Sequence, residues 1–295
     1  MNNKERGFLL LTGQLGNPER KPLTVAQFRS LAQRVAQMYK PADSRELTED
    51  DLLSLGYDHM TAQRVISLLS DGELLDKYLQ KGNRQGCVPI SRISQNYPLA
   101  VRQRLGLDAP GCLWAKGNIG LLNSQTVSLV GSRELHESNR IFAEIAGREV
   151  ARQGYTLVSG NARGADRTAQ DACLEAGGKV IAVVADSLEN HKSIENVLYL
   201  SEEVFDGDFT VHRALSRNRV IHSLGYITLV AQCDLGIGGT WDGTVKNLQK
   251  GWSPVFCFDD GSSATTELAQ RGAKLIGLTQ LASLAELKPD NQSLF

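Results

Sequence analysis

Apolar residues recur along this chain with two different spacings, and the change of spacing divides the sequence. In residues 1–82 they return every three or four positions, as in the segment LTVAQFRSLAQRVAQMY, which is the spacing of an amphipathic helix. The apolar positions of that segment are Val25, Phe28, Leu31, Val35 and Met38. Further along, Thr48 precedes a run of acidic residues and is an expected helix N-cap. We therefore predict a small helical domain over residues 1–82.

A single glycine, Gly56, separates two short helical segments in LLSLGYDHMTAQRVISLL. This arrangement is similar to a helix-hairpin-helix DNA module, but the second glycine of that hairpin is missing, so a plain helical bundle is the favoured interpretation. The pattern then changes over residues 83–125, which hold prolines between short apolar pieces. We interpret this segment as a connector that leads into a second domain over residues 126–295.

From about residue 126 short, continuously apolar segments alternate with helical ones. The expected strands are TVSLVG, YTLVSG, KVIAVVA, YITLVAQC, SPVFCF and AKLIGLT. The first expected helix, NRIFAEIAGREVARQG, has Ile141, Ile145, Val150 and Ala151 on its apolar side, and the stretch after KVIAVVA is expected to be irregular. Strands that are apolar throughout and are separated by helices indicate a parallel sheet covered on both faces. The fold class is therefore α/β, with a doubly wound, mostly parallel sheet.

Three glycine-containing loops follow expected strands of this sheet. Their residues are Gly131, Ser132 and Arg133 after the first strand, Ser159, Gly160, Arg163, Gly164 and Asp166 after the second, and Gly238, Gly239 and Thr240 after YITLVAQC. Ligands of open parallel sheets bind beyond the carboxyl ends of the strands. Glycine lets backbone N–H groups approach a ligand, and a helix N-terminus favours an anion. One such loop is equally a packing turn, but three on one edge predict a site for phosphate-bearing material.

None of these loops matches a dinucleotide or P-loop fingerprint, so an ordinary NAD or ATP site is disfavoured. The cluster Arg217-Asn218-Arg219 adds cations and leaves two interpretations open. If Ser216 caps the helix, both arginines lie in its first turn, where the helix dipole repels cations, and an anion site is indicated. If the helix starts near Thr210, they form a solvated face. Lys179, at the amino end of its strand, is by geometry a surface lysine.

Composition narrows the chemistry further. The net charge is −1, so nucleic acid can be bound only through a local patch. The five cysteines are scattered without a metal-ligand spacing, no apolar run is long enough for a membrane span, and we expect a cytoplasmic protein. For Asp166 we favour a structural role, as an acidic residue that stabilises a helix start, over a catalytic role. Trp241 is either a lid packed on the core or a surface on which a base stacks. We expect no catalytic residue, metal or cofactor.

The motifs VGSRE, SGNARGAD, GGKVIAVV and RNRVI occur in an order that resembles the DNA-processing protein A family, DprA, also called Smf. The resemblance covers most of residues 126–235 and implies an extended Rossmann-like core, with residues 1–82 similar in character to a sterile-alpha-motif-like domain. It implies a single-stranded DNA-binding protein of recombination that loads RecA during natural transformation. We also expect a homodimer.

The resemblance further implies roles for particular residues. Arg133, Lys179, Arg217, Asn218 and Arg219 would contact backbone phosphates, and Gly131, Ser132, Ser159, Gly160 and Gly164 would form the pocket floor. For Lys179 this conflicts with its expected place at the far end of the strand. Arg163 either points at the phosphate or braces the loop around Asp166.

Departures from the family leave a second class of function open. DSLENHKSIENVLYL stands where the family has an aspartate-tyrosine-proline segment, and GIGGTWDGT replaces its glycine-serine loop. The latter is similar to the loop of lysine-decarboxylase-like phosphoribohydrolases. Either alignment of it places Gly243 or Asn247 where those enzymes have a glutamate, which counts against hydrolysis. A nucleotide sensor that uses the same pocket is the remaining alternative.

Overall fold

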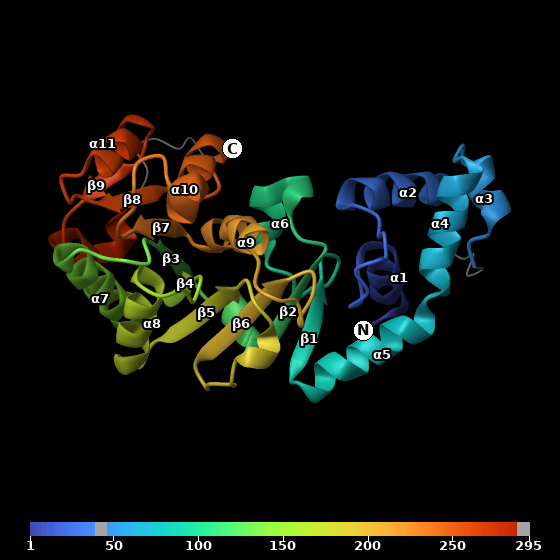
Figure 1. Cartoon of the computed structure of the whole chain (residues 1–295), viewed down its shortest axis with the longest axis horizontal. Coiled ribbons are helices and arrows are strands. Elements are labelled where there is room, and N and C mark those ends of the chain that lie inside the picture. The colour runs from blue at the N-terminus through green and yellow to red at the C-terminus, as the bar shows by residue number, and fades with distance from the viewer. Residues whose placement is uncertain (39–45, 288–295) are drawn as a thin grey trace. The chain divides into compact units, whose positions relative to one another are not determined.

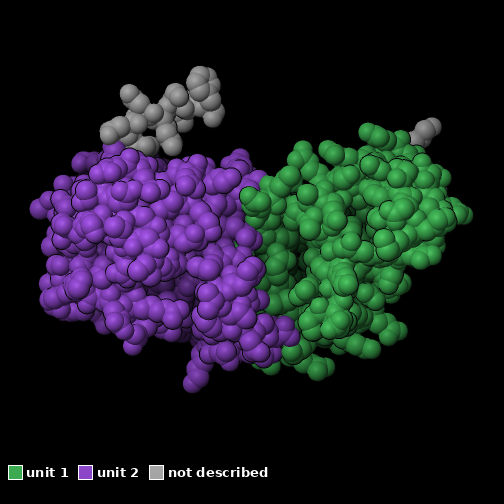
Figure 2. All heavy atoms as spheres, turned by 45° about the horizontal axis from the view of Figure 1, so that its top comes forward, with its two compact units in different colours: residues 1–97, 107–114, 202–205 green, residues 98–106, 115–201, 206–295 purple. Residues whose placement is uncertain are grey.

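The computed structural model describes residues 1–38 and 46–287, which form two compact units. Unit 1 comprises residues 1–97, 107–114 and 202–205, and unit 2 comprises residues 98–106, 115–201 and 206–295, of which 288–295 lie outside the described residues (Figure 2). The division into domains at residues 82 and 125 stays a prediction.

Unit 1 contains five helices in its described residues. They are α1 (Asn3–Thr12), α2 (Val25–Met38), α3 (Glu49–Ser54), α4 (His59–Ser70) and α5 (Gly72–Arg84) (Figure 1). Thr48 caps α3 as predicted, because its side chain accepts from the backbone N–H of Asp51 while the Asp51 carboxylate accepts from that of Thr48. The apolar face of α2 is narrower than predicted: Leu31 is buried and Met38 is exposed.

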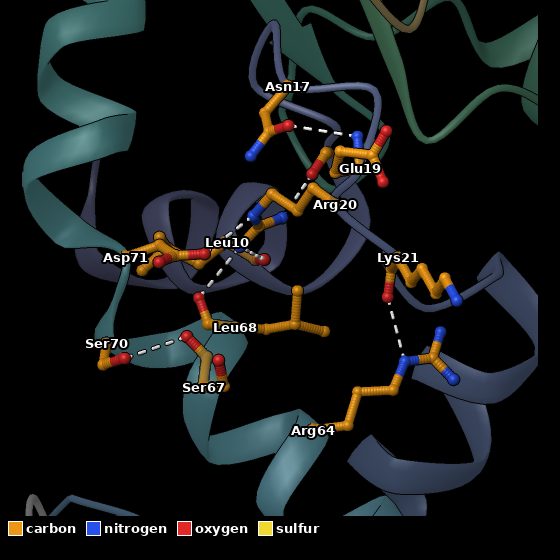
Figure 3. A network of polar contacts seen from close by, with 11 residues as sticks. Leu10, Asn17, Glu19, Arg20, Lys21, Arg64, Ser67, Leu68, Ser70 and Asp71 are labelled. Atoms are coloured by element: carbon orange, nitrogen blue, oxygen red, sulfur yellow. Dashed lines mark hydrogen bonds and ion pairs between the residues drawn. The ribbon is translucent and has the colours of Figure 1, made fainter.

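A buried arginine joins the ends of three helices of unit 1 (Figure 3). The guanidinium of Arg20 donates to the carbonyls of Leu10 and Gly13 at the carboxyl end of α1, and to that of Leu68 near the end of α4. It also contacts the Asp71 carboxylate, 2.8 Å away, at the start of α5. Cations are stabilised at helix C-termini, where carbonyls lack partners, so Arg20 satisfies groups that no backbone donor reaches.

The segment predicted as a connector holds regular elements. They are β1 (Cys87–Ser91), α6 (Leu99–Leu105), β2 (Cys112–Gly117) and two short 3-10 helices, η1 (Gly106–Asp108) and η2 (Ile119–Asn123). Its prolines are compatible with this structure, since Pro98 immediately precedes α6 and Pro110 lies in the turn before β2. Pro89 lies within β1, a position that proline tolerates in a strand only where its missing N–H is not needed.

Unit 2 is built on parallel strands in the order β6-β5-β4-β3-β7-β8-β9. The strands are β3 (Thr126–Val130), β4 (Thr156–Ser159), β5 (Lys179–Val184), β6 (Val197–Glu202), β7 (Ile227–Val230), β8 (Val255–Phe258) and β9 (Lys274–Ile276). The chain runs outward from β3 to β6, returns to the other side of β3 and runs outward again to β9. This is the predicted doubly wound α/β fold, and its topological switch point lies between β3 and β7.

Helices connect these strands and pack on one another in pairs. They are α7 (Glu137–Arg152), α8 (Ala165–Glu175), α9 (Val211–Leu224), α10 (Gly238–Lys250) and α11 (Ser263–Gln270), with short 3-10 helices η3 (Leu188–Asn190) and η4 (Thr279–Glu286). α7 lies against α8, and α9 lies against α10 (Figure 1). The core of the unit is the sheet itself, because every residue of β3, β4, β6, β7 and β8 is buried.

Two local predictions are wrong. The stretch after β5 is not wholly irregular, because β6 forms from VLYLSE within it and is buried along its length. In α7 Ile141 is exposed, and the small residues Ala143, Ala146 and Gly147 are buried instead, since the neighbouring helix α8 approaches closely. A Cβ at Gly147 would lie 2.2 Å from the carbonyl oxygen of Ala169 in α8. The packing therefore selects residue size there rather than hydrophobicity.

Candidate nucleic-acid interface

A pocket of about 630 Å³ opens at the topological switch point of unit 2. Its walls come from the loops that follow β3, β4 and β7, from one side of α9 and from the first turn of α10. Nine of the predicted site residues line it: Gly131, Ser132, Arg133, Arg163, Arg217, Asn218, Gly238, Gly239 and Thr240. The three glycine loops therefore meet at one edge of the sheet, as the chain order of strands and helices predicts.

Two glycines allow the first two loops to touch. A Cβ at Gly131 would lie 2.4 Å from the Cβ of Ala165, and one at Gly164 would lie 2.4 Å from the carbonyl oxygen of Ser132. Gly164 also has a φ of +87°, which disfavours any other residue. Across this contact the backbone N–H of Ala165, the first residue of α8, donates to the Ser132 carbonyl over 3.1 Å. The two loops form one rigid floor.

The third loop is tied to the first through Gln232, which follows β7. Its carbonyl accepts from the backbone N–H of Ser132 at 2.9 Å, and its side-chain oxygen accepts from the backbone N–H of His136 at 2.9 Å. At the start of α10 the Thr240 hydroxyl donates to the Gly131 carbonyl, also at 2.9 Å. These three hydrogen bonds hold the loops at this edge of the sheet in place. None of them uses the exposed side chain of Arg133 or Arg163.

Beneath the second loop the buried carboxylate of Asp166 accepts from the backbone N–H groups of Gly160, at 3.1 Å, and Ala162, at 3.2 Å. Burial raises the pKa of the Asp166 carboxyl, and the nearby Arg217 guanidinium and the two amide bonds oppose that rise. The guanidinium lies over Gly160, where an added Cβ would fall 1.4 Å from its Nη1 atom. Asp166 thus holds the loop from within, in the structural role that the sequence favours for it.

Of the two interpretations of this helix, a start near Thr210 is confirmed, but the solvated face that went with it is wrong for Arg217. α9 begins at Val211 with Thr210 as its N-cap, so Arg217 is not in the first turn. It is also not part of a solvated face, because only 8% of it is exposed. Its neighbour Asn218 donates to the Gly239 carbonyl at 3.0 Å and so links α9 to the start of α10.

The N-terminus of α10 faces the pocket with neither a capping side chain nor an acidic residue in its first turn. α10 begins at Gly238, its N-cap position is Ile237, and no side chain accepts from its first turn. By contrast, α8 has Asp166 in its first turn, and α9 is capped by Thr210. The first N–H groups of an α-helix lack intrahelical partners and attract negative charge. The start of α10 is therefore the place in the pocket best suited to an anion.

Two exposed arginines stand at the pocket rim. Arg133 follows β3 directly, and its charge acts on Asp166. Arg163 pairs with Glu134 at 2.9 Å, with both side chains largely in solvent. An exposed ion pair of this kind contributes little to stability and exchanges readily for another partner. Arg163 therefore braces the rim toward Glu134 rather than the loop around Asp166.

One part of the pocket lining, the apolar wall, consists of exposed apolar side chains. Phe209, Val211, Leu215 and Ile237 line it and are exposed by 51%, 68%, 41% and 70%. They come from the start of α9 and from the residue before α10. Exposed apolar side chains gathered around a pocket are typical of a ligand-binding surface. The pocket thus combines cations with exposed apolar surface.

Five predicted site residues do not line the pocket. Ser159 is buried and accepts from the Gln170 side chain at 2.6 Å, and Gly160 and Gly164 support the loop from below. Arg219 donates to the Ser216 hydroxyl at 2.9 Å. Lys179 is exposed at the amino end of β5, paired in register with Thr156 at the start of β4. Its place agrees with the geometric expectation, and the phosphate contact implied for it stays a prediction.

Trp241 is also outside the pocket lining. The Arg271 guanidinium lies over its ring, 5.8 Å from the centroid. It therefore packs toward α11 rather than offering a stacking face in the pocket.

Sequence reasoning missed the apolar wall together with Gln232 and His222, which also line the pocket. Phe209 and Val211 stand in a stretch without periodicity, and Ile237 lies inside a glycine-rich loop, so hydrophobic pattern alone carries no signal for them. The available hint was the pair Phe209 and Val211, two apolar residues that flank Thr210 at the helix start.

Comparison with known proteins identifies the family to which this site belongs. The sequence profile of the family described as DNA recombination-mediator protein A matches residues 89–287. The chain belongs to this family. The match includes every strand of unit 2 and all the loops around the pocket.

Individual members of the recombination-mediator family agree with this assignment. The DNA processing protein DprA of Bacillus subtilis is 27% identical over 217 residues, which cover 68% of this chain and 72% of that protein. The solved structure of DprA from Streptococcus pneumoniae is similar with a TM-score of 0.68 and 26% identity, and covers 90% of this chain and 99% of that one.

A second solved structure is DNA processing protein A from Helicobacter pylori, which has been described for its single-stranded DNA binding mode. Its TM-score is 0.58 at 24% identity, over 68% of this chain and 95% of that one, so it shows the shared fold. Among residues 1–38 and 46–287 no helix is long and apolar enough to cross a membrane. The same described residues contain no group of His, Cys, Asp and Glu suited to hold a metal ion.

Proposed function

We propose that the protein binds single-stranded DNA in the switch-point pocket of unit 2, within the predicted Rossmann-like domain of residues 126–295. The observation that carries the proposal is the pairing of two surfaces in one pocket. Arg133, Arg217 and the uncapped start of α10 form a site for phosphate, and the same pocket contains an exposed apolar wall. Each nucleotide of a single strand carries a phosphate that fits the first surface and a base whose face fits the second.

The apolar wall favours single strands over duplex. In a duplex the faces of the bases are stacked and hidden, whereas in a single strand each base has a free face that packs against apolar or aromatic side chains. Phe209 and Ile237 offer such a surface. The single-stranded DNA binding described for the Helicobacter pylori protein supports this choice.

The partners of the complex follow from the family. We propose that the DNA-bound protein acts in recombination during natural transformation, that it loads RecA, and that it works as a homodimer. Light scattering on the purified chain tests the dimer. RecA loading is tested by asking whether the protein speeds RecA filament formation on single strands coated with single-strand-binding protein. A monomer would contradict the proposed homodimer, and an unchanged rate of filament formation would contradict RecA loading.

The DNA proposal is tested by measuring binding of oligo(dT), duplex DNA and nucleoside monophosphates side by side. We expect oligo(dT) to bind most tightly. Binding of a monophosphate alone, or its hydrolysis, would instead support the nucleotide-sensor or phosphoribohydrolase alternative.

A charge-matched pair of variants locates the site. Arg133→Ala removes an exposed cation at the pocket rim and is expected to weaken oligo(dT) binding about tenfold, because charge-assisted bonds contribute about 1.5–3 kcal/mol. Arg148→Ala removes an equal charge from α7, where Arg148 pairs with Glu144, and serves as the control. Equal affinities of the two variants would place the DNA elsewhere.

A further inference from the structure

Gln232 is a buried polar residue that follows β7 and lies beside the loop that carries Arg133. Only 6% of it is exposed, and it lines the pocket together with Arg133. The hydrogen bonds between β3 and β7 continue past the ends of both strands, because the backbone N–H of Ser132 donates to the Gln232 carbonyl at 2.9 Å. The Ser132 hydroxyl donates to the same carbonyl at 3.3 Å. After Ser132 the chain leaves the sheet and has no regular structure until α7 begins at Glu137.

The side-chain amide of Gln232 bonds to this loop where the sheet ends. Its oxygen accepts from the backbone N–H of His136 at 2.9 Å, and its nitrogen donates to the Glu134 carbonyl at 3.1 Å. A backbone N–H only donates and a carbonyl only accepts, so a single orientation of the amide satisfies both. A residue of a parallel strand bonds its neighbour in the same manner, to the carbonyl of one residue and to the N–H of the residue two positions later. The amide thus takes the place of a neighbouring strand.

Arg133 lies between the two parts of the loop that Gln232 holds. Ser132, before it, is bonded to the main chain of Gln232, and Glu134, after it, is bonded to the side chain. Arg133 itself is exposed and lines the pocket. One residue therefore fixes the backbone on both sides of this cation, while the guanidinium stays accessible to a ligand.

The held loop affects how tightly an arginine binds a phosphate. A loop that becomes ordered only when the ligand arrives loses conformational entropy, and this loss reduces the affinity. A loop that is already held in place avoids that loss, and contacts on supported residues are also more precise. The hydrogen bonds of Gln232 supply this support to a segment that no strand or helix includes.

The two side-chain hydrogen bonds matter less for the stability of the fold. Glu134 and His136 are exposed residues, so water can replace the amide of Gln232 at their backbone groups. Loss of the amide is therefore expected to loosen the loop without unfolding the unit, and an effect on stability can be separated from an effect on binding.

We propose that Gln232 is a positioning residue for the phosphate contact of Arg133. Its side-chain amide holds the loop so that the guanidinium is in place at the pocket before the DNA binds. This inference rests on the proposed function and assigns to Gln232 an effect that acts through Arg133, not a contact with the DNA. The effect of removing the amide must then depend on whether Arg133 is present.

A double-mutant cycle measures that dependence. Gln232→Met removes both side-chain hydrogen bonds with little change in volume, and we expect it to weaken oligo(dT) binding about fivefold. This factor equals about 1 kcal/mol at 1.4 kcal/mol per tenfold, which is the order of magnitude of ordering the backbone of one residue. In the Arg133→Ala protein the same substitution should change the affinity by less than about twofold, since no guanidinium is left to position.

Gln153→Met is the matched control. The side-chain amide of Gln153 makes the same pair of backbone contacts, because it accepts from the N–H of Leu284 and donates to the carbonyl of Leu281, both at 2.8 Å. It also donates to the Glu149 carboxylate at 2.8 Å. Gln153 follows α7, at the opposite end of that helix from the loop of Arg133. Its replacement should leave the binding of oligo(dT) unchanged.

Hydrogen exchange of the loop amides reports the hydrogen bonds themselves. The His136 amide should exchange faster in Gln232→Met than in the wild type, whereas the Ser132 amide, which is bonded to the main chain, should keep its rate. If Gln232→Met fails to fold, Gln232→Asn replaces it in the cycle. Asparagine keeps the amide but is one methylene shorter, so it cannot reach both Glu134 and His136.

The dependence on Arg133 separates positioning from direct contact. Equal losses of affinity from Gln232→Met in the presence and absence of Arg133 would mean that Gln232 acts on the DNA by itself, and would overturn the proposal. Unchanged binding by Gln232→Met, when Arg133→Ala binds weakly, contradicts it as well. Failure of the wild type to bind oligo(dT), or binding by Arg133→Ala as tight as that of the wild type, would instead refute the proposed function, and this inference with it.

Discussion

At Gly160 the space of a side chain is occupied by another residue. An added Cβ would fall 1.4 Å from Nη1 of Arg217, so Gly160→Ala must displace the buried guanidinium from the carboxylate of Asp166. We expect a loss of about 1–3 kcal/mol in the free energy of unfolding, the usual effect of overpacking, together with weaker binding of oligo(dT). Chemical denaturation and fluorescence binding measure the two effects.

Gly7→Ala, a substitution within helix α1, provides the comparison for this stability measurement. The added methyl group meets no neighbour, and alanine is the better helix former, so the free energy of unfolding should rise slightly. Equal stability of the Gly160→Ala protein and the wild type would show that Arg217 moves freely, and would contradict the arrangement described here.

The buried imidazole of His222 predicts a pH dependence of stability. Its pKa is about 3 in the folded protein and about 6.5 in an unfolded chain. The unfolded state therefore binds the proton more tightly, and the stabilisation, complete above pH 6.5, is lost as the pH falls toward 3. From pH 7 to pH 5 the wild type should lose about 2 kcal/mol more of its free energy of unfolding than His222→Phe does.

Denaturant titrations of both proteins at the two pH values measure this difference. Because the remaining titratable groups are shared, their contributions cancel in the comparison. Parallel pH profiles of the two proteins would mean that the ring is charged, or solvated, in the folded state.

At the scale of elements, Arg20 connects the helices α1, α4 and α5 of unit 1. Arg20→Ala leaves the carbonyls of Leu10, Gly13 and Leu68 without their donor. We expect a loss of about 3 kcal/mol in the stability of unit 1, since each unsatisfied buried group costs about 1–3 kcal/mol and water reaches some of them. Hydrogen exchange of α1 and α4 amides localises the effect to this unit.

Arg64→Ala is the control for this prediction. Arg64 also donates to backbone carbonyls, those of Lys21 and Pro22, but it does so nearer the surface (Figure 3). Its removal should cost about 1 kcal/mol or less. Similar losses for the two variants would show that burial of the Arg20 guanidinium is unimportant.

At the scale of the whole molecule, the charge distribution predicts a shallow salt dependence of DNA binding. The net charge is −1, and the arginines that line the pocket are only Arg133, Arg163 and Arg217 among the described residues. Each neutralised phosphate of a single strand contributes about −0.7 to the slope of log K against log salt. We expect a slope of about −2, measured by fluorescence titration, and a steeper one would require cations outside the pocket.

How far the sequence predicts the structure depends on whether a feature is local. The strands β3, β4, β5, β7 and β8 are visible in the sequence because they are short, continuously apolar and bounded by glycine or polar residues. β6 was missed because the segment before it, which departs from the family pattern, contains no glycine or proline to mark where a strand would begin. The buried face of α7 was misplaced because close approach of α8 selects alanine and glycine over Ile141.

The residues of the candidate site likewise divide into those that the sequence predicts and those that depend on the tertiary structure. Strand order along the chain places Gly131, Arg133, Gly238 and Thr240 on one edge, since carboxyl ends of parallel strands meet there, and the pocket contains all of them. The burial of Arg217 over Gly160 could not be predicted, because it depends on where α9 starts and on how closely it approaches the loop after β4. The apolar wall is likewise assembled from residues that carry no shared pattern.

The sequence by itself determined the α/β class, the family and the edge of the sheet at which the loops gather. These depend on hydrophobic periodicity and on short motifs, which neighbouring residues in the chain decide. Only the tertiary structure decided which side chains enter the pocket, that Arg217 is buried, and that His222 is buried beside Asn247. Those properties depend on distances between atoms far apart in the chain, such as the 3.1 Å from Asn247 to His222, which no local pattern records.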